Sequence, residues 1–225
     1  MTTADAVRRR LGLGRLLPLG GAADGAWLAE QAAEAVLRSA AAQVPGVAPG
    51  RLRLALADPG AAATPAVPPP PSALPPGPLR IEADFGVGFA AVAQEPLPAT
   101  ASTLRTALFA AAAQLLDLEV AEVDLRVTEL LDAAPETGAP APPTGVRAVD
   151  PTDTAGTAAS RAPGVAHLTA TLGTPVHLAP DHVRVEVATA SGHRPLEVVR
   201  AVREAVTAAL ADDRPVAVLI TSVNC

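Results

Sequence analysis

The sequence has few of the residues from which common functional sites are built. Its one cysteine, Cys225, excludes an intrachain disulfide framework and a zinc site made of several cysteines. A single thiol suits a reducing compartment, so we expect a cytoplasmic protein. Aromatic residues make up only 2% of the 225 residues, which argues against a stacking platform for single-stranded nucleic acid.

Lysine is absent, and all 17 basic residues are arginine, a bias typical of GC-rich actinobacterial genomes. The net charge of −6 gives no overall field that would attract nucleic-acid phosphates, so we expect no nucleic-acid partner. The basic cluster Arg8-Arg9-Arg10 is followed by an apolar run that Arg15 and Pro18 interrupt, and it is therefore not predicted to be an export signal. Because no apolar run approaches the length of a bilayer, no direct membrane span is expected.

What the sequence does contain is one order of elements that occurs twice. In the first half, a helix is predicted to begin near Asp24, with Trp27 in its first turn, and to end at Val44-Pro45-Gly46-Val47. Two runs of alternating apolar and charged residues follow at 51–56 and 80–87. A helix over about 100–117 and a strand over 119–131 complete this half.

The second half repeats the order from about residue 154. A short helix leads into Pro163-Gly164-Val165, and β-type runs follow around 168–178 and 183–190. A helix over 196–210 and a strand over 215–223 close the chain. Since this last strand is apolar on both faces, it is predicted to lie in the middle of its sheet.

The repetition predicts an α+β fold of two repeated helix-strand-strand-helix-strand units, each a small sheet covered by helices on one face. The other sheet face bears charged residues in both halves, so it is expected to be solvated or to form a polar interface. The expected organisation is a flexible N-terminal segment at 1–23, a first unit at 24–131 with a Pro-rich insertion at 59–78, a linker at 132–153 and a second unit at 154–225.

The insertion contains Pro68-Pro69-Pro70-Pro71, which predicts an extended loop of polyproline II character. We interpret it as a tolerated surface insertion. The alternative is a ligand for a partner with an aromatic groove, because polyproline II is ordered before binding.

No catalytic, cofactor-binding or metal-binding residue is predicted, although several candidates exist. Gly12-Leu13-Gly14-Arg15 lacks a preceding strand and a third glycine, so it is interpreted as a flexible turn and not as a phosphate cradle. His177 and His182 flank a turn near Asp181, but their spacing matches no standard zinc pattern, and solvated turn histidines are preferred. The other two histidines are His167 and His193.

An acid/base pair could in principle come from strand carboxylates. Each of them alternates with arginine, as a water-facing, ion-paired sheet surface requires, and no nucleophile stands in a catalytic context. We therefore expect no enzyme. The candidate carboxylates are Glu82, Asp84, Asp124, Glu129 and Glu186.

The two Pro-Gly-Val turns, each followed by strands, a helix and a Val-rich last strand, resemble the alkaline shock protein family of bacterial envelope stress response proteins. The clearest match runs from Pro163-Gly164-Val165 to Val223, and residues 44–131 give a looser second copy. Family members usually carry one such unit, so the chain is similar to a duplicated actinobacterial offshoot. Proteins of this branch sometimes bear the name of a nucleopolyhedrovirus family.

The resemblance implies a non-enzymatic cytoplasmic protein that is linked to envelope maintenance through protein partners, and it supplies no catalytic residues. We therefore expect an interaction or scaffold protein, gathered near the membrane by an anchored partner. Exposed strand edges also make a homodimer reasonable. The alternative is a small-molecule-sensing module that binds a ligand between the two units, where Arg126, Arg184 or His182 would contact an anion.

Overall fold

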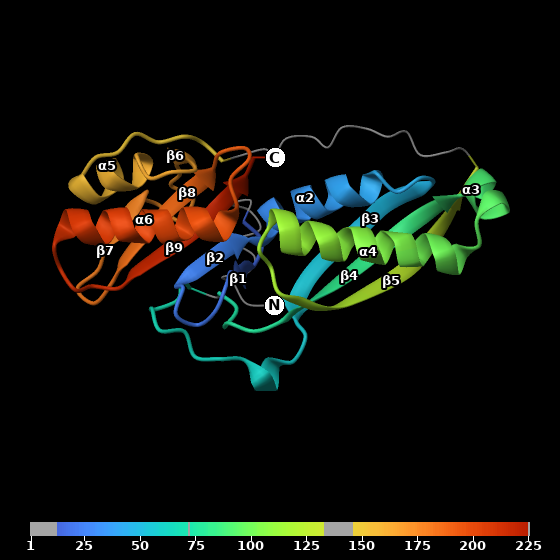
Figure 1. Cartoon of the computed structure of the whole chain (residues 1–225), viewed down its shortest axis with the longest axis horizontal. Coiled ribbons are helices and arrows are strands. Elements are labelled where there is room, and N and C mark those ends of the chain that lie inside the picture. The colour runs from blue at the N-terminus through green and yellow to red at the C-terminus, as the bar shows by residue number, and fades with distance from the viewer. Residues whose placement is uncertain (1–12, 72, 133–145, 225) are drawn as a thin grey trace.

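The computed structural model describes residues 13–71, 73–132 and 146–224, and it confirms the α+β class. Two sheets follow one another along the long axis of the molecule, and helices pack on both (Figure 1). The small sheet has the strand order β3-β4-β5. The large sheet has the order β1-β2-β9-β8-β6, and β7 pairs with β8 beside β6.

The small sheet is covered on one face by two helices, α2 and α4. In α4, Leu104, Leu108 and Ala111 recur at helical spacing and are buried, which fixes the face that packs on the sheet. The elements of this half are α2 (Glu30–Ala42), β3 (Val47–Leu56), a 3-10 turn (Pro59–Ala61), β4 (Leu79–Gly88), α3 (Phe89–Gln94), α4 (Leu97–Leu115) and β5 (Val120–Leu131).

The large sheet is covered on one face by α5 and α6, which pack against each other. The predicted central strand is confirmed, because β9 lies between β2 and β8 and all eight of its residues are buried. The elements of this half are α5 (Thr154–Ser160), β6 (Val165–Leu168), β7 (Val176–Leu178), β8 (Val183–Thr189), α6 (Pro195–Leu210) and β9 (Val216–Val223).

The two halves share one pairing scheme. β3 is antiparallel to β4, and β4 is parallel to β5. In the same way β6 is antiparallel to β8, and β8 is parallel to β9. A parallel pair needs a crossover connection, which α4 supplies in one half and α6 in the other. A common connectivity is what the repeated sequence order predicts, although the duplication itself remains an inference.

The two Pro-Gly turns have the same local geometry. Gly46 and Gly164 have φ angles of +74° and +81°, a region that side chains with a Cβ rarely adopt. The carbonyl of Gly46 accepts from the N–H of Gly88 at 2.9 Å, and that of Gly164 accepts from Ala190 at 2.7 Å. Each turn therefore joins the start of one strand to the end of its antiparallel neighbour.

The N-terminal region differs from the prediction. Trp27 lies in the strand β2 (Ala26–Ala29), not in a helix, and α2 begins only at Glu30. β2 pairs in parallel with β9, and β1 (Leu16–Pro18) pairs with β2, so both strands belong to the sheet of the C-terminal half. The described part of segment 1–23 is accordingly packed and not loose. The physical reason is that β9, apolar on both faces, needs an apolar neighbour on its outer edge.

The Pro-rich insertion is docked on these N-terminal strands. The indole Nε1 of Trp27 donates to the carbonyl of Leu74 at 3.3 Å, and the N–H of Leu74 donates to Leu16 at 2.9 Å. Val67 is 2% exposed, and Pro70 is also buried. The insertion is therefore part of the packing around β1 and β2, beyond the tolerated surface loop that the sequence predicts.

The second half differs from two predictions. The expected run at 168–178 is two short strands with a loop, residues 169–175, between them. Of the two alternatives for the face of the large sheet opposite the helices, a solvated face is wrong at Glu186, which is fully buried in polar contacts there. Both differences have one cause: the loop folds back over β8 and binds the Glu186 carboxylate through its main chain.

Candidate functional site

Among the described residues, Glu186 is the most deeply buried acid, with no exposed surface. Its Oε2 accepts the N–H of Thr171 at 2.7 Å and that of Leu172 at 3.1 Å, and Arg184 Nη2 lies 3.6 Å from Oε1. Burial raises the pKa of this carboxyl from 4.5 to about 7, against the opposing effects of the two N–H donors and Arg184. These donors come from the loop 169–175, so the carboxylate acts as a structural anchor for that loop.

The other predicted carboxylates lie on the uncovered face of the small sheet. Asp84 pairs with Arg126 at 3.5 Å, and Asp124 pairs with Arg80 at 3.6 Å, which confirms an ion-paired sheet surface. Glu82 and Glu129 are exposed on the same two strands. Exposed pairs of this kind contribute little to stability, and they keep the face hydrated.

The histidines near the β7–β8 turn are close to each other. The His177 and His182 ring centroids are 6.3 Å apart, and His182 Nδ1 lies 2.8 Å from Asp181 Oδ1. That hydrogen bond lowers the pKa of the Asp181 carboxyl. Among the described residues no group of three or more His, Cys, Asp or Glu side chains could hold a metal ion. Of the remaining histidines, His167 has a buried Nε2 without a hydrogen-bond partner, and His193 packs near Gly164.

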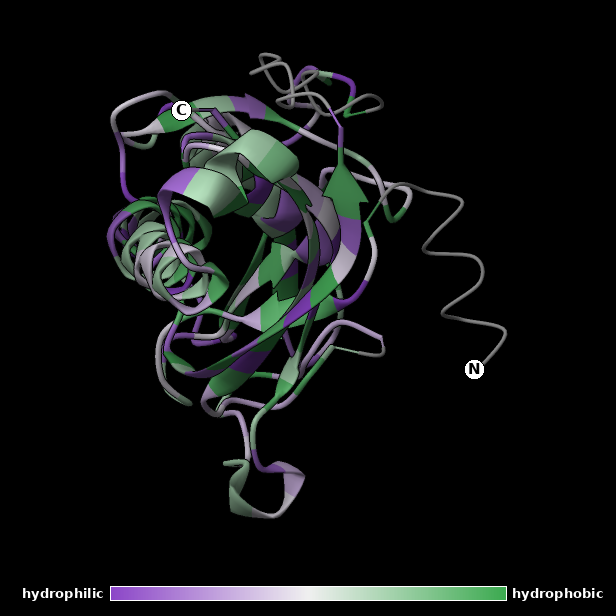
Figure 2. Cartoon of the chain, turned by 90° about the vertical axis from the view of Figure 1, so that its right-hand side faces the viewer, coloured by the Kyte–Doolittle hydropathy of each residue, from purple (hydrophilic) through white to green (hydrophobic). Residues whose placement is uncertain are grey.

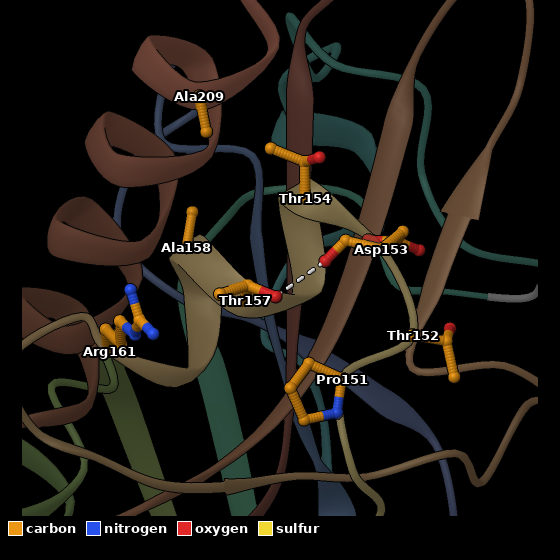
Figure 3. A pocket seen from close by; sticks show the side chains of 8 residues that line it. All are labelled: Pro151, Thr152, Asp153, Thr154, Thr157, Ala158, Arg161 and Ala209. Atoms are coloured by element: carbon orange, nitrogen blue, oxygen red, sulfur yellow. Dashed lines mark hydrogen bonds between the residues drawn. The ribbon is translucent and has the colours of Figure 1, made fainter.

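An open groove of about 590 Å³ lies beside α5 (Figure 3). Two of its polar lining residues are engaged in local hydrogen bonds: Asp153 Oδ1 accepts the N–H of Gly156 at 2.6 Å, and Thr157 Oγ1 donates to the Asp153 carbonyl at 2.9 Å. These bonds cap a short helix, so the groove is explained by local structure. A second concavity, under Phe85 and Leu108, holds only about 10 Å³.

The contact between the halves is closed by charged side chains that the sequence did not single out. Asp117, at the end of α4, accepts the N–H of Leu196 at 3.0 Å and pairs with Arg194, so it caps α6 from the other half. Within the half that contains the large sheet, Arg200 and Arg203 of α6 bind Asp24 in the β1–β2 connection. No motif signals such long-range caps, because their partners are far apart in the sequence.

The residues proposed to contact an anion between the halves are not brought together. Arg126 lies in the small sheet and pairs with Asp84 of that sheet. Arg184 and His182 lie in the other half, where their partners are Glu186 and Asp181.

Arg15 and Glu30 lie at another junction between the sheets. Glu30 accepts the N–H of Leu54 at the free edge of β3 and the N–H of Arg15, and Arg15 donates to the Leu54 carbonyl. Leu13–Arg15 is therefore tightly packed and not a flexible turn, whereas Gly12, Arg8-Arg9-Arg10 and Cys225 lie outside the described residues.

An exposed apolar cluster lies at the far end of the small sheet. Phe89 is 67% exposed, Leu130 58% and Val127 41%. Leu130 pairs with Val87, and Phe89 follows Gly88 directly at the end of β4, so the three side chains share one end of the sheet. We name these three residues, together with Arg126 and Glu129 of the same strand, the β5 surface. Figure 2 views the molecule from this end.

The β5 surface is exposed because α4 does not cover all of β5. Along the helix-facing side of β5, burial falls from Val123, which is 6% exposed, to Leu130. The buried stripe of α4 begins at a polar residue, Thr100, and it is apolar only from Leu104 onwards. That polar start is the sequence signal that could have predicted an uncovered strand end.

No protein-family model, curated protein or solved structure matches this chain. Within the described residues, the structure has no helix with the length and apolar character needed to cross a membrane.

Proposed function

We propose that this chain is a non-enzymatic interaction or scaffold protein that binds a protein partner through the β5 surface. The observation that carries the proposal is the joint exposure of Phe89, Val127 and Leu130 at the end of an edge strand. Scattered apolar side chains are ordinary, but an apolar cluster beside an unpaired strand edge is typical of a docking surface.

The use of the buried ionisable groups supports a role without catalysis. Glu186 holds the loop 169–175, Asp117 caps α6, and Glu30 satisfies the free edge of β3. Each of these carboxylates is already occupied by main-chain donors. A general base needs a carboxylate that can reach a substrate proton, and these three have no such freedom.

We further propose a link to the envelope stress response, through a membrane-anchored partner that gathers the protein in the cytoplasm. The support is the sequence resemblance, in which Pro-Gly-Val turns lead into strands, a helix and a Val-rich last strand. The matching geometry of the Gly46 and Gly164 turns gives that resemblance a physical basis.

Affinity capture from source cells tests the docking surface. The variant is Leu130→Asp, and the matched control is Leu178→Asp, which alters a side chain that is 49% exposed in the other sheet. We expect wild type and L178D to retain the same partner and L130D to lose it. In a deletion strain under alkaline and envelope stress, wild type and L178D should restore survival and L130D should not. Unchanged capture and full complementation by L130D would contradict the proposal.

The alternative function is a sensing module with a ligand between the two units. It has weaker support, because the contact between the halves is closed by the Asp117–Arg194 pair and by the hydrogen bonds of Glu30 to Arg15 and Leu54. Thermal-shift measurements with amino acids, nucleotides and divalent metals separate the two functions. A saturable shift that the variant Arg194→Ala abolishes would favour sensing.

A further inference from the structure

We propose that the partner bound at the β5 edge is a second copy of this chain, whose β5 adds antiparallel to the first across a two-fold axis. The inference rests on the proposed function, since it names the partner of the β5 surface. Two small sheets would then form one continuous sheet. Antiparallel addition at an edge needs no connecting chain, and a two-fold contact is the commonest arrangement of homodimers.

Only the later part of the β5 edge is free for such pairing. No strand of the described chain pairs with the outer side of β5, which runs for 12 residues. Arg105 of α4 already donates from Nε to the carbonyl of Val123 at 3.3 Å. Between Leu125 and Leu131, the main-chain groups that face away from β4 have no partner strand among the described residues, and this is also where the exposed apolar side chains lie.

A bulge in β5 restricts the registers that self-pairing can use. Phe85 pairs with Val127 and Gly86 pairs with Glu129, so Thr128 is an extra residue without its own partner in β4. In a regular strand, residues three positions apart point to opposite faces of the sheet. Because of the bulge, Arg126 and Glu129 point to the same face. Leu125 and Leu130 share the other face for the same reason.

In one register these residues are complementary to themselves. With the two-fold axis between Val127 and Thr128, Arg126 lies opposite Glu129 of the second copy, and Leu125 lies opposite its Leu130. Because the axis is two-fold, the Arg126–Glu129 contact and the Leu125–Leu130 contact each occur twice in the dimer. Residues directly opposite in an antiparallel pair have Cβ atoms about 5 Å apart, close enough for an ion pair and for apolar contact. A register centred on Thr128 would instead place Arg126 against Leu130.

The composition of the edge fits a specific dimer better than open-ended aggregation. Arg126 and Glu129 are charged and lie on the edge strand, and unmatched charges at an edge prevent indiscriminate pairing. In the self-complementary register Glu129 gains an arginine partner, and Arg126, which pairs with Asp84 at 3.5 Å, gains a second carboxylate. This register also covers Leu130, which is the most exposed apolar side chain of β5.

A charge-swap series on the full chain tests the dimer. Arg126→Glu and Glu129→Arg each place like charges in contact twice, whereas the double variant R126E/E129R restores both pairs in reversed order. By sedimentation velocity over a concentration series, we expect wild type and the double variant to dimerise with similar affinity, and each single variant to bind about tenfold more weakly or worse. The control Arg51→Glu reverses an exposed charge on β3, at the opposite edge, and should dimerise as wild type does.

Circular dichroism melting of every variant ensures that a loss of dimer is not a loss of fold. Cross-linking then reports the register. In a Cys225→Ser background, R126C/E129C should form disulfides between copies, because opposite Cβ atoms are within disulfide reach and residues three apart in one strand are not. Thr128→Cys should cross-link poorly. Efficient cross-linking of T128C alone, with none by R126C/E129C, would overturn the proposed register.

The outcomes separate this inference from the proposed function. A wild-type chain that stays monomeric up to about 0.5 mM would overturn self-pairing, because a dimer with a higher dissociation constant would be too weak to be useful. If L130D then still loses a captured partner, the docking function stands with a different occupant. Dimerisation that no charge swap affects also overturns the inference, since the contact would lie elsewhere.

Discussion

The main-chain N–H of Thr171 donates to Oε2 of Glu186 at 2.7 Å, so a loop at the edge of the large sheet is held by a carboxylate that is fully buried. Burial disfavours the charged form of this carboxylate, while the N–H donors and Arg184 favour it. The raised pKa shows that burial is the larger effect. Because the carboxylate that holds the loop has a raised pKa, the stability of the protein is expected to depend on pH.

Stability is predicted to fall as pH rises through the range between the unfolded and folded pKa values of Glu186. The folded pKa is about 7 and the ordinary value is 4.5, so the folded state keeps a proton that the unfolded state has released. The free energy of unfolding should drop by on the order of 3 kcal/mol from below pH 4.5 to above pH 7. Urea unfolding at a series of pH values measures this drop.

Glu186→Gln should flatten that profile and leave the protein more stable than wild type above pH 7. The matched control is Glu82→Gln, because Glu82 is exposed on the small sheet and its variant should retain the wild-type slope. Parallel profiles for wild type and E186Q would show that another group titrates.

Two glycines with similar backbone angles are predicted to respond differently to alanine. Gly164 and Gly192 have φ of +81° and +79°, so both variants lose about 1 kcal/mol to backbone strain. A Cβ on Gly164 would also lie 2.6 Å from Val198 Cγ2, whereas a Cβ on Gly192 meets nothing within 4 Å. G164A should therefore be clearly less stable than G192A in denaturant unfolding. Equal losses would mean that the Pro-Gly turn tolerates the added methyl group.

Removing the cap that Asp117 provides should loosen α6 from the other half. Asp117→Ala is expected to cost about 1–2 kcal/mol, because Leu196 loses its acceptor at the start of the helix. Asp117→Asn should cost less, since asparagine keeps an acceptor oxygen and tolerates the positive φ of 55°. Asp181→Ala, at an exposed acid, is the control and should change stability by less than about 0.5 kcal/mol. A D117A loss no larger than that of D181A would contradict the cap.

Trp27 should report the folding of the large sheet by fluorescence. It is the only tryptophan and is 1% exposed, so its emission should be blue-shifted in the folded state and move to longer wavelength on unfolding. Trp27→Phe leaves the Leu74 carbonyl without its donor and should cost about 1–3 kcal/mol. Phe89→Leu, at an exposed aromatic, should leave the unfolding midpoint nearly unchanged. A wild-type emission maximum near that of free tryptophan would contradict the docking of the insertion on β2.

Periodicity in the sequence predicted the elements whose burial is decided locally. The apolar stripe of α4, the alternation along β4 and the doubly apolar β9 each reflect which faces are covered, and all three are confirmed. The Pro-Gly turns were predicted for a similar reason, since Gly46 must adopt a positive φ whatever surrounds it.

Features that depend on distant partners were not predictable in this way. The local sequence predicts that Trp27 lies in the first turn of a helix. It lies in a strand because β2 pairs with the edge of β9, which is far away in the sequence. Glu186 alternates with Arg184 like a surface residue, and only the loop 169–175 explains its burial. The exposure of Leu130 depends on where α4 begins, which local alternation in β5 does not reveal.

The parallel pairing of β2 with β9 has a consequence for synthesis on the ribosome. The central strand of that sheet, β9, is translated after all its other strands. The edges of β2 and β8 that face β9 therefore stay unpaired until β9 has been synthesised. The hairpin of β1 and β2 therefore keeps an unpaired edge until residues 216–223 have been synthesised, and an unpaired strand edge can pair with other chains.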